Sequence, residues 1–284
     1  MVRAAGARRY RCALLRGASR RPDPSVTDFS FTALLMSLVT DPRFPAAVAV
    51  TCLSGVVRGF SGFGSALIYV PLMAAIYEPR IAAVTLLITD SVASMPFTVN
   101  ETRRCNWREV APVSFAAIAT IPLGVLALQY FEPVTLRWGI AVLVVCLLAV
   151  MVSGWRYHVE PSIPTSIGVG LFAGIGTGAV QISGPAAIIY WLGGPAKATT
   201  IRANLMVYFA LTALASFVIY YLRGLFTADV LVLSLLLGPV FIVSMAAGTL
   251  LFRGSSDVNY RRVAYAIIAL SALVSLPLFD ELVR

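Results

Sequence analysis

Six uninterrupted apolar stretches, separated by short polar breaks, constrain the fold of this chain more than any other feature. Each stretch is between 17 and 23 residues long, and about 20 helical residues cross a hydrocarbon core roughly 30 Å thick. Lipid offers no hydrogen-bond partner to an open backbone, so such a stretch must fold as a helix. The stretches are Ile81–Val99, Val110–Phe131, Leu136–Ser153, Ile201–Leu222, Val230–Phe252 and Arg262–Leu278. They predict an all-α, polytopic bundle of transmembrane helices.

Two longer apolar blocks are interrupted by glycines and decide how often the chain crosses the membrane. Ala46–Tyr77 is interrupted at Arg58–Gly64, and Thr165–Leu192 is interrupted at Gly174–Gly178 and again at Ser183–Pro185. Counted once each, the two blocks bring the total to 8 spans. The total rises to 10 if each block crosses twice as two half-length helices, and a re-entrant path is a further alternative.

The composition agrees with a lipid environment. Hydrophobic residues make up 59% and charged residues 12% of the chain, against roughly 45–50% and about 25% in soluble domains. The net charge of +9 comes largely from seven arginines in the first 21 residues and from the short breaks. That distribution is typical of cytoplasmic loops rather than of a folded basic face that binds nucleic acid. We therefore expect a multi-pass protein of the cell inner (plasma) membrane, with the bilayer and not nucleic acid as its partner.

The two broken blocks are similar to each other, which predicts an internal repeat. Positions in the first recur 114 residues later in the second: Gly62 and Gly176, Gly64 and Gly178, Pro71 and Pro185. We predict a first transmembrane repeat over residues 36–153, a central polar loop over 154–164 and a second repeat over 165–284. Internal repeats of this kind are common in secondary transporters.

The relative orientation of the repeats is less constrained. The arginine-rich loops of the two halves are not equivalent: one holds Arg103, Arg104 and Arg108, the other Arg253, Arg261 and Arg262. This exchange favours inverted repeats, which need an odd number of crossings in each half. Eight spans in two parallel repeats stay open as the alternative.

The first 35 residues form a basic tail, which we expect to be disordered. An organelle targeting segment, or translation that starts at Met36, are alternative interpretations of the same arginine-rich, acid-poor sequence.

Small residues and one arginine make the first break a candidate anion site. Glycines allow the backbone to leave helical geometry, and N–H groups at the start of a half-helix attract anions. Arg58 adds a forked donor, and an arginine inside a membrane costs at least about 2.5 kcal/mol, so it is rarely idle. The candidate residues are Arg58, Gly59, Ser61, Gly62 and Gly64. Close helix packing is the alternative role for the glycines, and an arginine that reaches the interface is the alternative for Arg58.

The second break offers neutral groups in place of a cation. Its candidate substrate-binding residues are Gly176, Thr177, Gly178, Gln181, Ser183 and Gly184. Two related breaks in an otherwise apolar chain predict a binding site at the midplane of the membrane.

Three polar residues within the apolar blocks complete the candidate site. Asp90 lies near the centre of its block, where a carboxylate is a proton carrier or an ion-pair partner of Arg58 or Arg80. Arg202 and Asn204 lie near the start of a block in the second half. Both are candidates for the same cavity, and Arg202 is equally a candidate for a loop at the interface.

Enzyme chemistry has little support in this sequence. It contains one histidine, His158, and four scattered cysteines, so a Ser–His–Asp triad within the spans and a multi-ligand metal site are both excluded. We expect no enzyme activity, no cofactor and no metal.

With these breaks in view, the chain resembles the TauE/SafE-type sulfite exporter family, also called the toluenesulfonate uptake permease family. The resemblance covers nearly all of residues 38–279 and rests on TDPRFPAAVAVTCLSGVVRGFSGFGSALIYVPLMAAIYEPRIAA in the first half and GLFAGIGTGAVQISGPAAIIYWL in the second. Arg58 stands where the family often has a lysine or another basic residue. The chain departs from the pattern at Gln181 and Ser183, where the family often has glycine.

The resemblance implies a secondary transporter of a small sulfur-containing anion, most simply sulfite or an organosulfonate. A channel-like anion pore and a non-transporting membrane scaffold are the alternatives, and a homodimer stays open. An anion that leaves a negatively charged cytoplasm gains about 2.3 kcal/mol per charge per 100 mV, which favours export.

Overall fold

The computed structural model describes residues 31–61, 64–153, 162–182, 184–192 and 197–252. Residues 1–39 and 40–284 form separate units, and the first contributes one described helix, α2 (Phe31–Val39). The predicted last span Arg262–Leu278, most of the predicted tail and most of the central loop lie outside the described residues.

Every regular element of the described ranges is an α-helix, so the predicted all-α class is confirmed. The second unit contains α3 (Phe44–Ser61), α4 (Ser65–Ile76), α5 (Pro79–Glu101), α6 (Trp107–Tyr130), α7 (Pro133–Val152), α8 (Ile163–Val180), α9 (Gly184–Leu192), α10 (Ala198–Leu222) and α11 (Ala228–Phe252). Within this part of the chain, helices α6, α7, α8, α10 and α11 are long and apolar enough to cross a membrane. The count of eight to ten spans stays a prediction.

Both predicted helix breaks occur, but over shorter segments than expected. The first lies between Ser61, where α3 ends, and Ser65, where α4 begins. Gly64, just before α4, adopts a φ of 91°, a conformation that suits glycine. Arg58 and Ser61 remain inside α3. The second lies between Val180, where α8 ends, and Gly184, where α9 begins. Gln181, just after α8, adopts a left-handed φ of 57°.

The predicted break at Gly174–Gly178 is wrong, because α8 runs through it without interruption. A glycine in a helix costs only about 1 kcal/mol relative to alanine, and here close packing against a second helix compensates. A Cβ atom at Gly170, Gly174 or Gly178 would collide with α6. These glycines follow one another at four-residue intervals and bring the backbones of α8 and α6 together.

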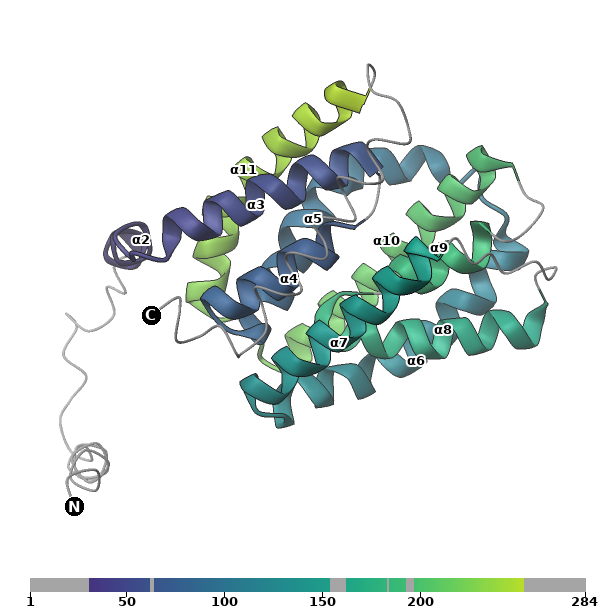
Figure 1. The fold of residues 1–284 in the computed structure, drawn as a ribbon, viewed down its shortest axis with the longest axis horizontal. Helices are drawn as coiled ribbons and strands as arrows, with labels where there is room; N and C mark the ends of the chain where they lie inside the picture. The colour runs from purple at the N-terminus through teal and green to yellow at the C-terminus, as the bar shows by residue number, and fades with distance from the viewer. Residues whose placement is uncertain (1–30, 62–63, 154–161, 183, 193–196, 253–284) are drawn as a thin grey trace. The chain divides into compact units, whose positions relative to one another are not determined.

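Helices α3 and α11 form a second close pair of the same kind (Figure 1). Gly55 and Gly59 of α3 leave no room for a Cβ beside α11, and Gly248 of α11 leaves none beside α3. The hydroxyl of Thr249 donates to the Gly59 carbonyl at 3.0 Å. Each close pair therefore joins a helix from the first half of the sequence to one from the second.

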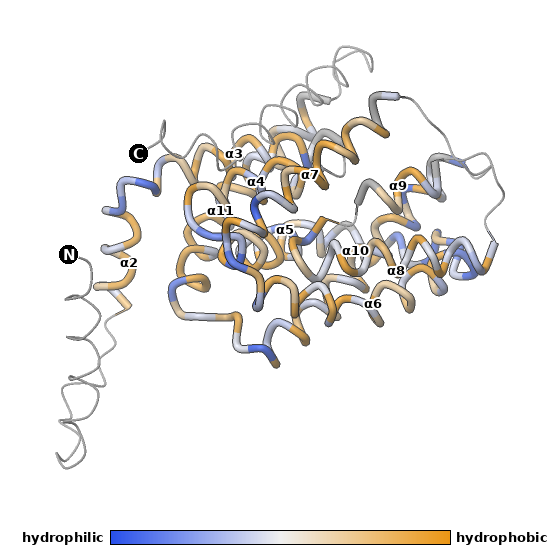
Figure 2. Tube along the Cα trace, turned by 60° about the horizontal axis from the view of Figure 1, so that its bottom comes forward, coloured by the Kyte–Doolittle hydropathy of each residue, from blue (hydrophilic) through white to orange (hydrophobic). Residues whose placement is uncertain are grey.

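The outward faces of these helices are apolar. Figure 2 shows hydrophobic residues along most of each helix, with hydrophilic residues gathered mainly near helix ends and connections. Phe115 and Leu123 of α6 and Val243 of α11 are exposed. Such a surface is suited to lipid, and it identifies a multi-pass membrane protein.

Candidate functional site

The two helix breaks line a common cavity. It has a volume of about 70 Å³, well below the range of roughly 300–1,000 Å³ that is usual for drug-sized ligands. Gly64 and Ser65 approach it from the first break, and Gln181 and Ile182 from the second. Helices α3, α5, α8 and α10 complete the wall. The size and position suit a small ion held between the two halves of the sequence.

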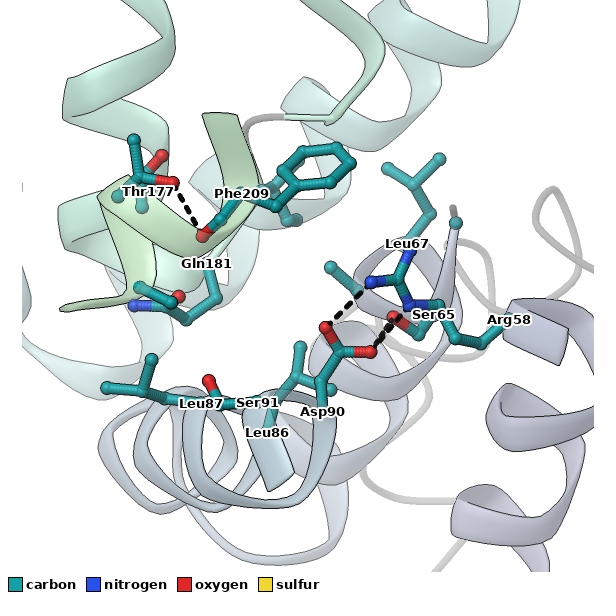
Figure 3. A pocket seen from close by; sticks show the side chains of 15 residues that line it. Arg58, Ser65, Leu67, Leu86, Leu87, Asp90, Ser91, Thr177, Gln181 and Phe209 are labelled. Atoms are coloured by element: carbon teal, nitrogen blue, oxygen red, sulfur yellow. Dashed lines mark hydrogen bonds and ion pairs between the residues drawn. The ribbon is translucent and has the colours of Figure 1, made fainter. Parts of the chain in front are cut away.

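One side of the cavity carries an ion pair. Arg58 of α3 donates from Nε to Asp90 Oδ1 at 2.7 Å and from a terminal nitrogen to Asp90 Oδ2 at 3.2 Å (Figure 3). The same terminal nitrogen donates to the hydroxyl of Ser94 at 3.0 Å. Two parallel bonds of this kind fix both side chains in one plane. Asp90 thus pairs with Arg58, which was one of the two partners that the sequence suggested.

Asp90 is the more accessible member of this pair. Its side chain is 25% exposed, whereas that of Arg58 is 10% exposed. The hydroxyl of Ser65, at the start of α4, lies 3.4 Å from Asp90 Oδ1. The carboxylate therefore connects the break, the arginine and the open part of the cavity.

The opposite side of the cavity is neutral. Gln181 donates from its amide to the Tyr220 hydroxyl at 3.2 Å, and that hydroxyl donates to the Gly178 carbonyl at 2.9 Å. These bonds hold Gln181 in its left-handed conformation at the end of α8. Thr177 lies one turn earlier and donates to the carbonyl of Ala173. This side offers amide and hydroxyl groups without a formal charge (Figure 3).

An aromatic ring joins the two sides. The guanidinium carbon of Arg58 lies 5.7 Å from the centre of the Phe209 ring, from α10, a distance at which a cation is attracted to the ring face. Leu67, Leu86 and Leu87 add aliphatic surface. The cavity can therefore hold a small group with a polar, oxygen-rich end and an apolar end.

Five of the predicted site residues line this cavity: Arg58, Gly64, Asp90, Thr177 and Gln181. Gly59 and Gly178 instead face the backbones of α11 and α6, which matches the packing alternative. Gly176 lies inside α8, and a Cβ there would approach the carbonyl of Ile182. Ser61 and Gly184 end α3 and begin α9, respectively. Gly62 and Ser183 lie outside the described residues.

Asn204 and Arg202 do not line the cavity. Asn204 is fully buried, where it accepts from the Asn106 backbone N–H at 2.7 Å and donates to Glu109 at 3.1 Å. Arg202 is exposed. Both precede by one to two turns the part of α10, Phe209 to Ala213, that reaches the cavity. Asn204 thus ties the start of α6 to α10.

Sequence reasoning did not identify several residues that line the cavity or support it, among them Ser65, Ser94, Phe209 and Tyr220. Ser65 and Ser94 lie close in sequence to residues that were predicted, so a wider window around the break and around Asp90 would have included them. Phe209 and Tyr220 carry no such signal, because an aromatic residue in an apolar helix is ordinary. Within the described residues, no group of three or more His, Cys, Asp or Glu is placed to hold a metal ion.

Comparisons with known proteins agree with this arrangement. Residues 47–275 match the family described as "Sulfite exporter TauE/SafE". The chain is also similar to a protein of Cupriavidus necator described as "Probable sulfite/organosulfonate exporter TauE", with 26% identity in an alignment that covers 69% of this chain and 78% of that relative. No solved structure matches the chain significantly. Because the family match extends over most of the sequence and includes both helix breaks, this chain belongs to the TauE/SafE sulfite exporter family.

Proposed function

We propose that this protein is a secondary transporter that exports a small anion, sulfite or an organosulfonate, across the inner (plasma) membrane. The observation that carries the proposal is that two separate breaks between apolar helices line one cavity beside Arg58. The relative in Cupriavidus necator, named as a probable sulfite/organosulfonate exporter, supports the same substrate class.

The physical chemistry of the cavity suits an oxyanion. The first turn of α4, from Ser65 to Leu67, lines the cavity, and the N-terminus of a helix carries a partial positive charge that attracts anions. Arg58 supplies a fork of N–H donors that matches two oxygens of one sulfur group. The neutral donor of Gln181 can bond a third oxygen.

The aliphatic side chains of the wall influence which anions fit the cavity. Sulfite and a methyl-substituted sulfonate both present three oxygens on one sulfur, and they differ in a lone pair or a small apolar group at the fourth position. Leu86, Leu87 and Ala213 offer that position an apolar contact. A cavity of about 70 Å³ favours short substituents over aromatic ones.

The arrangement also supports two repeats that exchange helices, in a register different from the one the sequence suggested. Three pairs of helix boundaries are each 119 residues apart. They are the ends of α3 and α8 (Ser61 and Val180), the starts of α4 and α9 (Ser65 and Gly184), and the starts of α5 and α10 (Pro79 and Ala198). In this register, Gly55 and Gly59 correspond to Gly174 and Gly178, which make the two close helix pairs. Rocking of one repeat against the other would open the shared cavity to each side of the membrane in turn.

The function is tested by flux through the purified protein in liposomes. Sulfite and methanesulfonate should each produce saturable transport, whereas a pore would give flux that rises linearly with concentration. Arg58→Gln should lower transport at least about 100-fold, because it removes a charged, hydrogen-bonded contact of roughly 3 kcal/mol. Arg103→Gln, at an exposed loop arginine, is the matched control and should transport normally. Full activity of Arg58→Gln would exclude this cavity as the site.

A further inference from the structure

The guanidinium of Arg58 already has an anionic partner, and this determines what else must happen when a substrate binds. Both of its bonds to Asp90, at 2.7 Å and 3.2 Å, use donors that an oxyanion in the cavity would need. A neutralised guanidinium attracts a second anion far more weakly than a bare one. An anion must therefore compete with Asp90 for Arg58.

The charge balance of the cavity makes the competition severe. Among the described residues that line it, Arg58 and Asp90 carry the formal charges, and these cancel. The other helices packed against α5 also carry ionisable groups, but none of the following lines the cavity. Three of them are hydrogen-bonded to other residues: Tyr69 of α4 to Thr85, Tyr220 of α10 to Gly178, and Glu109 of α6 to Asn106 and Asn204. Arg137 belongs to α7, and Asp229 of α11 is exposed. Helix α8 contributes Thr177, and Gln181 follows directly after this helix; neither residue ionises. A bound anion would leave one uncompensated negative charge at membrane depth.

We propose that Asp90 takes up one proton each time an anion binds, so that this protein moves a monovalent anion together with a proton, as a neutral unit whose direction follows the sum of the anion and proton concentration gradients rather than the membrane potential. The inference rests on the proposed function of the cavity. A proton from water adds to a carboxylate oxygen of Asp90, and the two Arg58 N–H groups exchange that carboxylate for two oxygens of the anion. The sum of charges in the cavity stays at zero throughout. When the anion leaves, Asp90 releases the proton and pairs with Arg58 again.

The geometry assigns the proton to Asp90 rather than to its partners. Arginine stays protonated in proteins, so Arg58 cannot adjust its own charge. Asp90 is the more exposed of the pair, so water in the cavity can deliver a proton to it. Once protonated, its carboxyl O–H can donate to Ser65, which already lies 3.4 Å away, or to the anion itself.

This balance predicts the substrate class. One proton compensates one negative charge, so the cavity takes a monovalent oxyanion, such as a sulfonate or hydrogen sulfite. A dianion such as sulfate would need a second proton acceptor, and none occurs among the described residues that line the cavity.

The test is calorimetry of the full chain in detergent with methanesulfonate, which stays fully ionised over the range used. Titrations in two buffers with different protonation enthalpies count the protons taken up with the anion. We expect about one proton per anion in the wild type, and an affinity that weakens by up to tenfold for each pH unit on the alkaline side. Asp90→Asn should bind without proton uptake and with an affinity that no longer depends on pH. Asp229→Asn, at an exposed acid of α11, is the control and should keep the wild-type uptake.

Each contrary result has a distinct meaning. Wild-type binding without proton uptake, or an Asp90→Asn variant that keeps the pH dependence, would overturn the coupling and leave the anion site in place. Failure of the wild type to bind methanesulfonate or sulfite at any pH would overturn the proposed function and the coupling together. If Asp90→Asn does not fold, a proton gradient directed into liposomes that contain the wild-type protein decides instead. It should drive methanesulfonate uptake if proton and anion move together, and no uptake would overturn the coupling.

Discussion

The two helix breaks have the same architecture but different chemistry. Each ends a helix that packs through glycines on a partner from the other half of the sequence, α3 on α11 and α8 on α6. The first break is held by the Arg58–Asp90 ion pair, whereas the second is held by Tyr220 and Gln181 through neutral hydrogen bonds. The glycine packing is shared by both breaks, and the charge is present at one of them.

The difference suits a site that must release what it binds. Two arginines facing one anion would hold it too tightly, and passage across a membrane requires binding that is also easily reversed. Each additional buried arginine would also carry its own cost of insertion into the membrane. In the proposed mechanism, Arg58 fixes the sign of the substrate once Asp90 is protonated, and the neutral side provides donors that bind more weakly. Three kinds of substitution test what the two breaks share and where they differ: they disturb the glycine packing, place an acid in both halves, or weaken the neutral side of the cavity.

The largest effect should come from the shared packing. Gly59→Leu and Gly178→Leu each place a side chain where the backbone of a neighbouring helix lies, Met245 in the first case and Ile121 in the second. We expect each substitution to destabilise the protein by about 3 kcal/mol, because neither backbone can move aside. Thermal unfolding in detergent measures the change.

A glycine with free space provides the control for these two substitutions. Gly238, in the interior of α11, has nothing within 4 Å of its missing Cβ, so Gly238→Ala should leave stability unchanged or raise it by up to about 1 kcal/mol. If only one of the two leucine variants unfolds at lower temperature, the two helix pairs are not equivalent.

The second prediction concerns a substitution, Phe209→Asp, that gives both halves an acid at equivalent positions. Phe209 corresponds to Asp90 at the 119-residue spacing, and its ring centre lies 5.7 Å from the Arg58 guanidinium carbon. Phe209→Asp adds a second acid beside that cation, and two charges about 6 Å apart interact by nearly 3 kcal/mol at an effective dielectric constant of about 20. The affinity for methanesulfonate near neutral pH should therefore fall roughly 100-fold.

Phe209→Asn separates the charge from the loss of the ring. It has nearly the shape of the aspartate variant without its charge, so its affinity should stay much closer to that of the wild type. Equal losses in the two variants would mean that the aromatic ring, and not the neutrality of this position, is what the site requires. Calorimetry with the same probe measures both.

The sequence predicted the helices well and the second break poorly, for a physical reason. Long apolar stretches are local features, and lipid leaves them no alternative to a helix. Glycines at Gly174 and Gly178 have the same appearance whether they interrupt a helix or bring two helices together, and the distinction depends on α6, which lies far away in sequence. The true break falls at Gln181, where a residue other than glycine adopts a left-handed conformation supported by Tyr220.

The candidate site was only partly predictable for a similar reason. The sequence identified Arg58 and Asp90 as polar residues within apolar blocks, because such residues are costly at membrane depth. It left the partner of Asp90 open between Arg58 and Arg80, and the structure places Arg80 instead against the backbone carbonyl of Leu128 at the end of α6. Asn204 has the same sequence character as Asp90, yet it bonds Asn106 and Glu109 away from the cavity.

The smallest effect should come from the neutral side of the cavity. Tyr220→Phe removes the hydroxyl that bonds both the Gly178 carbonyl and the Gln181 amide, and a lost neutral hydrogen bond of this kind costs about 1 kcal/mol. We expect a modest decrease in unfolding temperature and a several-fold weaker affinity for methanesulfonate, because Gln181 is then less firmly held toward the cavity. Tyr221→Phe, at the adjacent and 75% exposed tyrosine, is the matched control and should change neither. If the two variants behave alike, the second break keeps its shape without Tyr220, and the left-handed turn at Gln181 must be maintained by the ends of α8 and α9 alone.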